Sequence, residues 1–152
     1  MVLRLVLGFV FTAMAVGQLA SVAAMPDILG AYGLVHGAAA AVLAVALIVV
    51  ELVCGVWFLS RPRSRALAPV WMYTAVAVVW AMLAGQAFAR GLTVDNCGCF
   101  GNYLTQSLSW FVLVQDALLL VYAAVLLRTA YRVDGAARSA GDAPAGRRAQ
   151  LP

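Results

Sequence analysis

The hydrophobic positions of the chain are grouped into four long runs that are separated by short polar segments. Each run is about 20 residues long and nearly free of charge, which is the length an α-helix needs to cross the hydrocarbon core of a bilayer. The runs cover residues 5–24, 37–59, 69–89 and 110–127. Their pattern predicts an all-α membrane protein, a bundle of four transmembrane helices.

The composition agrees with this pattern. Of the 152 residues, 65% are hydrophobic and only 11% are charged, whereas about a quarter of the residues in a soluble domain are charged. This composition excludes a soluble enzyme, a nucleic-acid binder and a disordered regulator. After a transmembrane domain over residues 1–132, residues 133–152 turn to Gly, Ala, Pro and Arg without periodicity, which predicts a disordered cytoplasmic tail.

The net charge is +4, and the positions of the arginines indicate how the chain is oriented in the membrane. In the four-span arrangement, only Arg90 lies on the side of the connections between spans one and two and between spans three and four. The opposite side holds Arg4, Arg61, Arg63, Arg65, Arg128, Arg132, Arg138, Arg147 and Arg148. The positive-inside rule therefore predicts that both termini are cytoplasmic. We expect a multi-pass protein of a bacterial inner membrane. The first run is too long for a typical secretory leader, so we expect it to be retained.

The connection between the third and fourth runs contains Cys97-Gly98-Cys99-Phe100-Gly101, on the predicted extracytoplasmic face. Disulfides form in that compartment, so two cysteines one residue apart can alternate between dithiol and disulfide. A bond that closes only three residues contributes little stability, which argues against a structural cross-link. Gly98 helps the backbone to bend, and strain makes such a bond oxidising. Gly101 permits another tight turn, and Phe100 can fix the depth of the loop.

Two other roles for these cysteines remain open. Thiolates bind soft metals, and with Cys54 they would suit a soft-metal binding or transport protein. Two thiolates do not complete a tetrahedral site, so we expect no metal. The second alternative is a non-catalytic structural subunit of a membrane complex. Cys54 itself is expected to be a small buried hydrophobic residue.

Several short segments together resemble a known family. They are Ala31-Tyr32-Gly33-Leu34 before the second span, Glu51-Leu-Val-Cys54-Gly55 within it, the Cys97–Gly101 motif, and Leu108-Ser109-Trp110 at the start of the fourth. Over residues 1–128 the chain resembles the MauE/DoxX family of redox-associated membrane proteins, and MauE more closely. The resemblance implies a four-helix bundle that supports disulfide formation or thiol transfer outside the cytoplasm with a thioredoxin-like partner. MauE itself is associated with maturation of a disulfide-rich methylamine dehydrogenase subunit, but the resemblance implies for this chain only the class of chemistry.

Three polar residues are supporting candidates. Glu51 lies about 21 Å below the outer end of the second span, counted at 1.5 Å per residue, and a carboxyl group at that depth is a functional hypothesis by default. It could form a structural hydrogen bond, accept a proton or contact a quinone, but its depth argues against direct proton exchange with the cysteines. Asp116, two turns into the fourth span, is a better candidate for handling protons there. His36, at the start of the second span, could lower a thiol pKa if it approached the cysteines.

We therefore expect a membrane thiol-disulfide oxidoreductase or its accessory subunit, in which Cys97 and Cys99 are the catalytic residues. Either cysteine could attack, and the position of Cys97 before the turn slightly favours it. The expected partners are an extracytoplasmic thioredoxin-like protein and the lipid bilayer, with no nucleic acid. A membrane quinone is the candidate electron acceptor, although no sequence motif indicates a quinone site.

Overall fold

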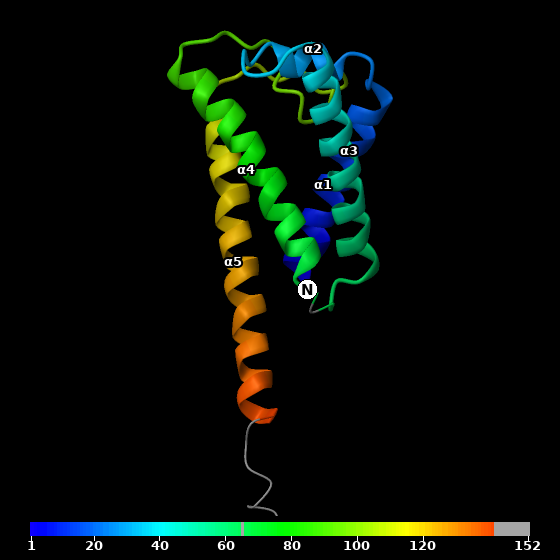
Figure 1. The fold of residues 1–152 in the computed structure, drawn as a ribbon, viewed down its shortest axis with the longest axis vertical. Coiled ribbons are helices and arrows are strands. Elements are labelled where there is room, and N and C mark those ends of the chain that lie inside the picture. The colour runs from blue at the N-terminus through cyan, green and yellow to red at the C-terminus, as the bar shows by residue number, and fades with distance from the viewer. Residues whose placement is uncertain (65, 142–152) are drawn as a thin grey trace, which may run out of the picture.

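The fold is described by a computed structural model that covers residues 1–64 and 66–141 (Figure 1). Its helices are α1 (Val2–Ala20), α2 (Met25–Gly30), α3 (Gly37–Ser60), α4 (Ala68–Ala89) and α5 (Trp110–Gly141). The described residues contain no strand. The all-α class predicted from the sequence is therefore confirmed.

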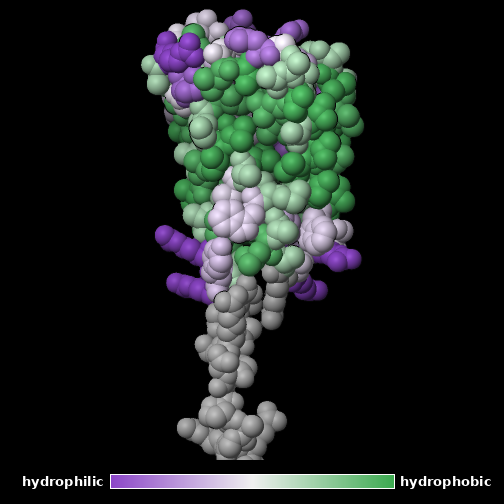
Figure 2. Space-filling model, in the orientation of Figure 1, coloured by the Kyte–Doolittle hydropathy of each residue, from purple (hydrophilic) through white to green (hydrophobic). Residues whose placement is uncertain are grey.

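Four of these helices, α1, α3, α4 and α5, are long and apolar enough to cross a membrane. On the face seen in Figure 2, hydrophobic residues form a broad band, and hydrophilic residues gather above and below it. Large apolar side chains on the four helices, such as Phe9, Val42, Met82 and Val121, are exposed. In water they would be unfavourable, but in a bilayer they face lipid.

The first helix ends earlier than the hydrophobic run predicts. Residues 21–24 form a turn, because the helix stops at Ala20 and the short helix α2 begins at Met25. The Ser21 hydroxyl donates to the carbonyl oxygen of Gly17 at 2.8 Å. Pro26 lies in the first turn of α2, where a missing backbone N–H costs nothing. Helix α1 therefore ends about one turn before residue 24, where the hydrophobic run ends.

At the other end of the chain, α5 continues beyond the predicted span to Gly141. Residues 133–141, expected to belong to a disordered tail, are thus part of a helix. Ala and Arg have high helix propensities, and the first proline after the span is Pro144, so nothing breaks the helix directly after the membrane. The rest of the expected tail, residues 142–152, lies outside the described residues.

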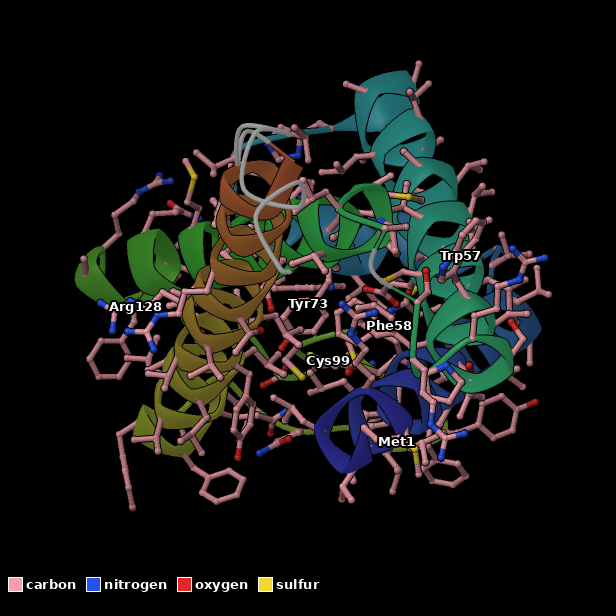
Figure 3. The ribbon with its side chains drawn as sticks, turned by 90° about the horizontal axis from the view of Figure 1, so that it is seen from below. Met1, Trp57, Phe58, Tyr73, Cys99 and Arg128 are labelled. Atoms are coloured by element: carbon pink, nitrogen blue, oxygen red, sulfur yellow. The ribbon has the colours of Figure 1, made fainter. Side chains whose placement is uncertain are left out.

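The bundle is built on the packing of α1 against α3, and α4 packs on α3 and on α5. The α1–α3 crossing is close because small residues face each other: a Cβ at Gly55 would lie 2.5 Å from Thr12 Oγ1, and one at Gly8 would lie 3.0 Å from the Gly55 carbonyl oxygen. In the described residues, α1 and α5 make almost no direct contact. Seen along the bundle, the two helices stand apart, with side chains between them (Figure 3).

The connections gather at the two ends of the bundle (Figure 1). At one end, Arg4 donates to the carbonyl oxygen of Ser64 and its guanidinium lies 5.6 Å from the centroid of the Phe58 ring. These contacts join the start of α1 to the α3–α4 connection. The other end carries α2 and the connection between α4 and α5, residues 91–109, which we call the cysteine loop.

Candidate functional site

The cysteine loop folds back between the helices. Cys97 and Cys99 are only 2% and 4% exposed, and Cys99 is seen near the middle of the bundle in the view along it (Figure 3). The loop lies backbone to backbone on α1, since a Cβ at Gly17 would be 2.7 Å from the carbonyl oxygen of Phe100. The two sulfurs of the loop are therefore part of the protein core.

Asn96 shapes the turn that carries the two cysteines. Its side-chain oxygen accepts a hydrogen bond from the backbone N–H of Gly98 at 3.0 Å, and its side-chain nitrogen donates to the Gly101 carbonyl oxygen at 2.9 Å. Gly98 and Gly101 have φ values of 82° and 60°, in the left-handed region that glycine adopts without a steric penalty. The glycines of the motif are thus required by the backbone of the turn.

The carbonyl groups of both cysteines are held by side chains from other parts of the chain. The Tyr32 hydroxyl donates to the Cys97 carbonyl oxygen at 2.8 Å, and Gln18 Nε2 donates to the Cys99 carbonyl oxygen at 3.0 Å. In addition, the Cys97 N–H donates to the Gln106 carbonyl oxygen at 2.8 Å. Burial raises the pKa of Tyr32, so its hydroxyl keeps the proton that this hydrogen bond needs. The Cys-Gly-Cys backbone is therefore fixed at both ends.

Glu51 is connected to the cysteine loop through Gln18. The carboxyl group is fully buried; Oε2 accepts from Gln18 Nε2 at 2.8 Å, and Oε1 accepts from Trp80 Nε1 at 2.7 Å. The same Gln18 nitrogen reaches the carbonyl oxygen of Cys99. Residue counting placed the cysteine loop far from Glu51, but the loop descends toward this residue, so the inferred separation is wrong. The hydrogen bonds of the carboxyl group itself go to Gln18 and Trp80.

The two thiols of the loop have different acidities. A hydrogen bond from the Cys99 thiol lowers the pKa of Cys97 to about 7, despite opposition from burial and from the charge of Asp116. That same interaction with Cys97, together with burial, raises the pKa of Cys99. Near neutral pH the thiolate therefore resides on Cys97, and the thiolate is the nucleophilic form. Asp116 of α5 is itself buried and acts electrostatically on both sulfurs.

The remaining candidates lie apart from this turn. His36 precedes the first residue of α3, and its Nδ1 would be 3.6 Å from a Cβ at Gly30. Cys54 is buried, and its thiol donates to the Pro69 carbonyl oxygen at 3.3 Å, so it joins α3 to α4. Cys54, Cys97 and Cys99 are all free thiols. No group of three or more His, Cys, Asp or Glu residues in the described part of the chain is arranged to hold a metal ion.

Sequence reasoning missed several residues of this site. Gln18 and Trp80 lie within hydrophobic runs, and Tyr32 was only part of a resemblance motif. Gln18 carried one usable signal, because it is among the few polar interruptions of the first run. Asn96 carried another, as it directly precedes Cys97 and Asn side chains favour turns. Neither signal predicts which carbonyl or carboxyl group the Gln18 or Asn96 side chain contacts.

A cleft of about 390 Å³ opens between α1 and α5. Val10 and Val114 contribute to its apolar walls, and Phe100 of the cysteine loop contributes at the position next to Cys99. Gln115 and Tyr122 are its polar lining residues. The cleft lies where the two helices make almost no direct contact.

Fold and site together define a class: a multi-pass membrane protein with four spanning helices that buries a Cys-Gly-Cys loop at one end of its bundle. Within that class, the chain belongs to the MauE family, since the model of this family, described as methylamine utilisation protein MauE, matches residues 1–129. The match includes the whole cysteine loop and nearly all of the membrane-spanning part. No curated protein and no solved structure matches the chain.

Proposed function

We propose that the protein is a membrane thiol-disulfide exchange protein whose reacting groups are Cys97 and Cys99. The observation that carries this proposal is the pairing of the two thiols in one fixed turn, where the hydrogen bond from Cys99 leaves Cys97 with a pKa of about 7. An attacking thiol is most effective when its pKa lies near the ambient pH. Cys97 is thus the nucleophile and Cys99 the resolving thiol.

The exchange proceeds in two balanced steps. The Cys97 thiolate attacks one sulfur of a partner disulfide, which forms a mixed disulfide and releases the other partner sulfur as a thiolate. Cys99 then loses its proton and attacks the Cys97 sulfur, which closes the Cys97–Cys99 disulfide and releases the second partner thiolate. Two electrons pass from the pair to the partner. The reverse sequence oxidises the partner and reduces the pair.

Burial imposes a condition on this reaction. A protein disulfide cannot reach sulfurs that are 2% and 4% exposed, so the cysteine loop has to leave the bundle before exchange. Local opening of a loop costs less than global unfolding, and hydrogen bonds at two carbonyl groups of this loop help to hold it in place. Small reagents should therefore react with Cys97 more readily than bulky ones.

The proposed partner is a thioredoxin-like protein on the extracytoplasmic side of a bacterial inner membrane. The distribution of arginines supports this orientation, because Arg4 and the α3–α4 connection lie at the end of the bundle opposite the cysteine loop (Figure 1). MauE membership supports a redox role in the maturation of an exported, disulfide-rich protein.

Electrons that enter the pair from a reduced partner need an acceptor. We assign this role to a membrane quinone, which would enter the α1–α5 cleft from the lipid. Oxidation of the dithiol to the disulfide releases two electrons and two protons, and reduction of a quinone to a quinol consumes the same number. The apolar walls of the cleft and its boundary at Phe100 support this assignment.

The proposed function is tested by thiol trapping in membranes equilibrated with graded dithiol and disulfide buffers, in a C54A background that leaves only the loop cysteines. We expect reversible oxidation with a potential above roughly −250 mV, between thioredoxin and the disulfide isomerases. A pair that never oxidises would reject exchange and favour soft-metal binding. A bond that resists every reductant would favour a structural subunit.

A further inference from the structure

Gln18 joins three parts of the chain with one side-chain nitrogen. The residue belongs to α1 and is completely buried. Its Nε2 donates to Glu51 of α3 at 2.8 Å and to the Cys99 carbonyl oxygen of the loop at 3.0 Å. Its Oε1 is the buried side-chain polar atom in the described part of the chain that has no hydrogen-bond partner.

The carboxyl group of Glu51 determines which way this amide faces. In the opposite orientation Gln18 Oε1 would face two acceptors, the Glu51 oxygen and the Cys99 carbonyl oxygen, and both hydrogen bonds would be lost. Glu51 is itself held by Trp80 Nε1 at 2.7 Å, and the same indole lies beside the turn, 3.5 Å from a Cβ at Gly98. The carboxyl group is therefore fixed before it orients Gln18.

We infer that Glu51 and Gln18 are positioning residues for the thiol pair: Glu51 orients the Gln18 amide, which holds the Cys99 backbone so that the Cys99 thiol stays within hydrogen-bonding reach of Cys97. This inference rests on the proposed function, because the position of the thiol pair matters only if the pair reacts. If it is correct, the buried carboxyl group of Glu51 affects the reactivity of Cys97 through Gln18 and Cys99, without contacting the Cys97 sulfur.

The effect is specific because, among the described residues, no cation supports the Cys97 thiolate. The ionisable groups around the two thiols are Asp116 of α5, which acts on both, Glu51 of α3, which acts on Cys99, and Tyr32, whose own pKa the thiols raise. All of them are acids, and a nearby negative charge opposes a thiolate. The hydrogen bond from Cys99 is thus the main support for the charge on Cys97. A shift of the Cys99 backbone would weaken it.

The experiment measures the alkylation rate of Cys97 by iodoacetamide as a function of pH in nanodiscs, in the C54A background. Q18M removes both hydrogen bonds at similar volume, and E51Q replaces the carboxyl group by an amide that cannot accept from both Gln18 and Trp80. We expect the midpoint of the pH profile to rise by one unit or more in both variants. At pH 7 a rise of one unit lowers the thiolate fraction about fivefold.

The matched control is Y73F. Tyr73 is buried in α4, and its hydroxyl donates to the Leu119 carbonyl oxygen at 3.0 Å, so Y73F also removes one buried hydrogen bond but leaves the cysteine loop untouched. Its midpoint should equal that of the parent. A folded Q18M protein with an unchanged midpoint would overturn the inference.

A folding defect in the single variants is addressed with the double variant Q18M/E51Q, which removes the buried carboxyl group and leaves an acceptor for Trp80. If none of the three variants folds, the two residues hold the bundle together and the positioning role is rejected. Failure of the proposed function is separate: in that case the parent pair does not cycle between dithiol and disulfide. If the parent cycles and Q18M keeps its midpoint, only the positioning role fails.

Discussion

The hydroxyl of Tyr32 and the carbonyl oxygen of Cys97 form a hydrogen bond of 2.8 Å between residues that are 65 positions apart. The carbonyl oxygen of Tyr32 in turn accepts a hydrogen bond from Gln86 Nε2 at 2.8 Å. This chain of contacts joins the connection after α2, the end of α4 and the cysteine loop. The first cysteine is therefore held by residues from two other segments of the bundle.

Y32F should loosen the loop. The change leaves a buried carbonyl oxygen without a partner, which costs about 1–3 kcal/mol, and the lost energy favours the open loop. We expect Cys97 to react several-fold faster with a bulky maleimide, measured by mass shift in nanodiscs. Y103F is the control, because Tyr103 is 71% exposed. Equal rates in Y32F and the parent would contradict a closing role for Tyr32.

Replacement of Cys99 should change the pH dependence of Cys97. C99A removes the thiol whose hydrogen bond lowers the pKa of Cys97 to about 7, so the alkylation midpoint should rise toward the ordinary thiol value of 9. The thiolate fraction at pH 7 would then fall about fiftyfold. C99S keeps a donor and should give an intermediate midpoint. If C99A and C99S titrate alike, the hydrogen bond is not the cause of the lowered pKa.

G101A should displace the loop, and G91A should not. Both glycines have positive φ, 60° and 66°, so both substitutions carry a similar backbone cost. Only a Cβ at Gly101 meets other atoms, namely Ser21 Oγ and, at 2.6 Å, the Gly17 carbonyl oxygen, whereas the space around Gly91 is open. We expect a lower thermal midpoint and faster Cys97 alkylation in G101A than in G91A. Equal behaviour would show that the loop does not rest on α1.

Filling the α1–α5 cleft should block electron transfer to a quinone without affecting thiol exchange. V114W places an indole in the cleft, and the control V45W adds the same group to the lipid-facing side of α3, where Val45 is 54% exposed. We expect V114W to lose oxidation of the pair by a soluble ubiquinone analogue, followed by thiol trapping, and to equilibrate normally with dithiol buffers. Unchanged quinone oxidation in V114W would reject this cleft as the acceptor site. Loss in both variants would point to a general effect of the added indole.

The sequence predicted the four spans well because uninterrupted apolar runs leave the chain few alternatives in a bilayer. It also pointed to Cys97 and Cys99 as the proposed reacting pair, since they are the only cysteines in a connection. It did not predict where the loop lies. Counting 1.5 Å per residue along the second span placed Glu51 far from the cysteines. Such a count cannot predict that the cysteine loop turns inward toward Glu51. That inward turn depends on contacts such as Gln18 with Cys99, which unite residues 81 positions apart.

The close packing of α1 on α3, with little contact between α1 and α5, has a consequence for the order in which the helices assemble. Spans inserted first can pack first, and the close α1–α3 crossing at Gly8 and Gly55 needs only the first two spans. Gln18 and Glu51 would then already face each other when the last span enters the bilayer. The cysteine loop, which follows the third span, would then meet an α1–α3 pair that is already packed. Biogenesis would thus leave these sulfurs open to oxidants until the final step closes the loop over them.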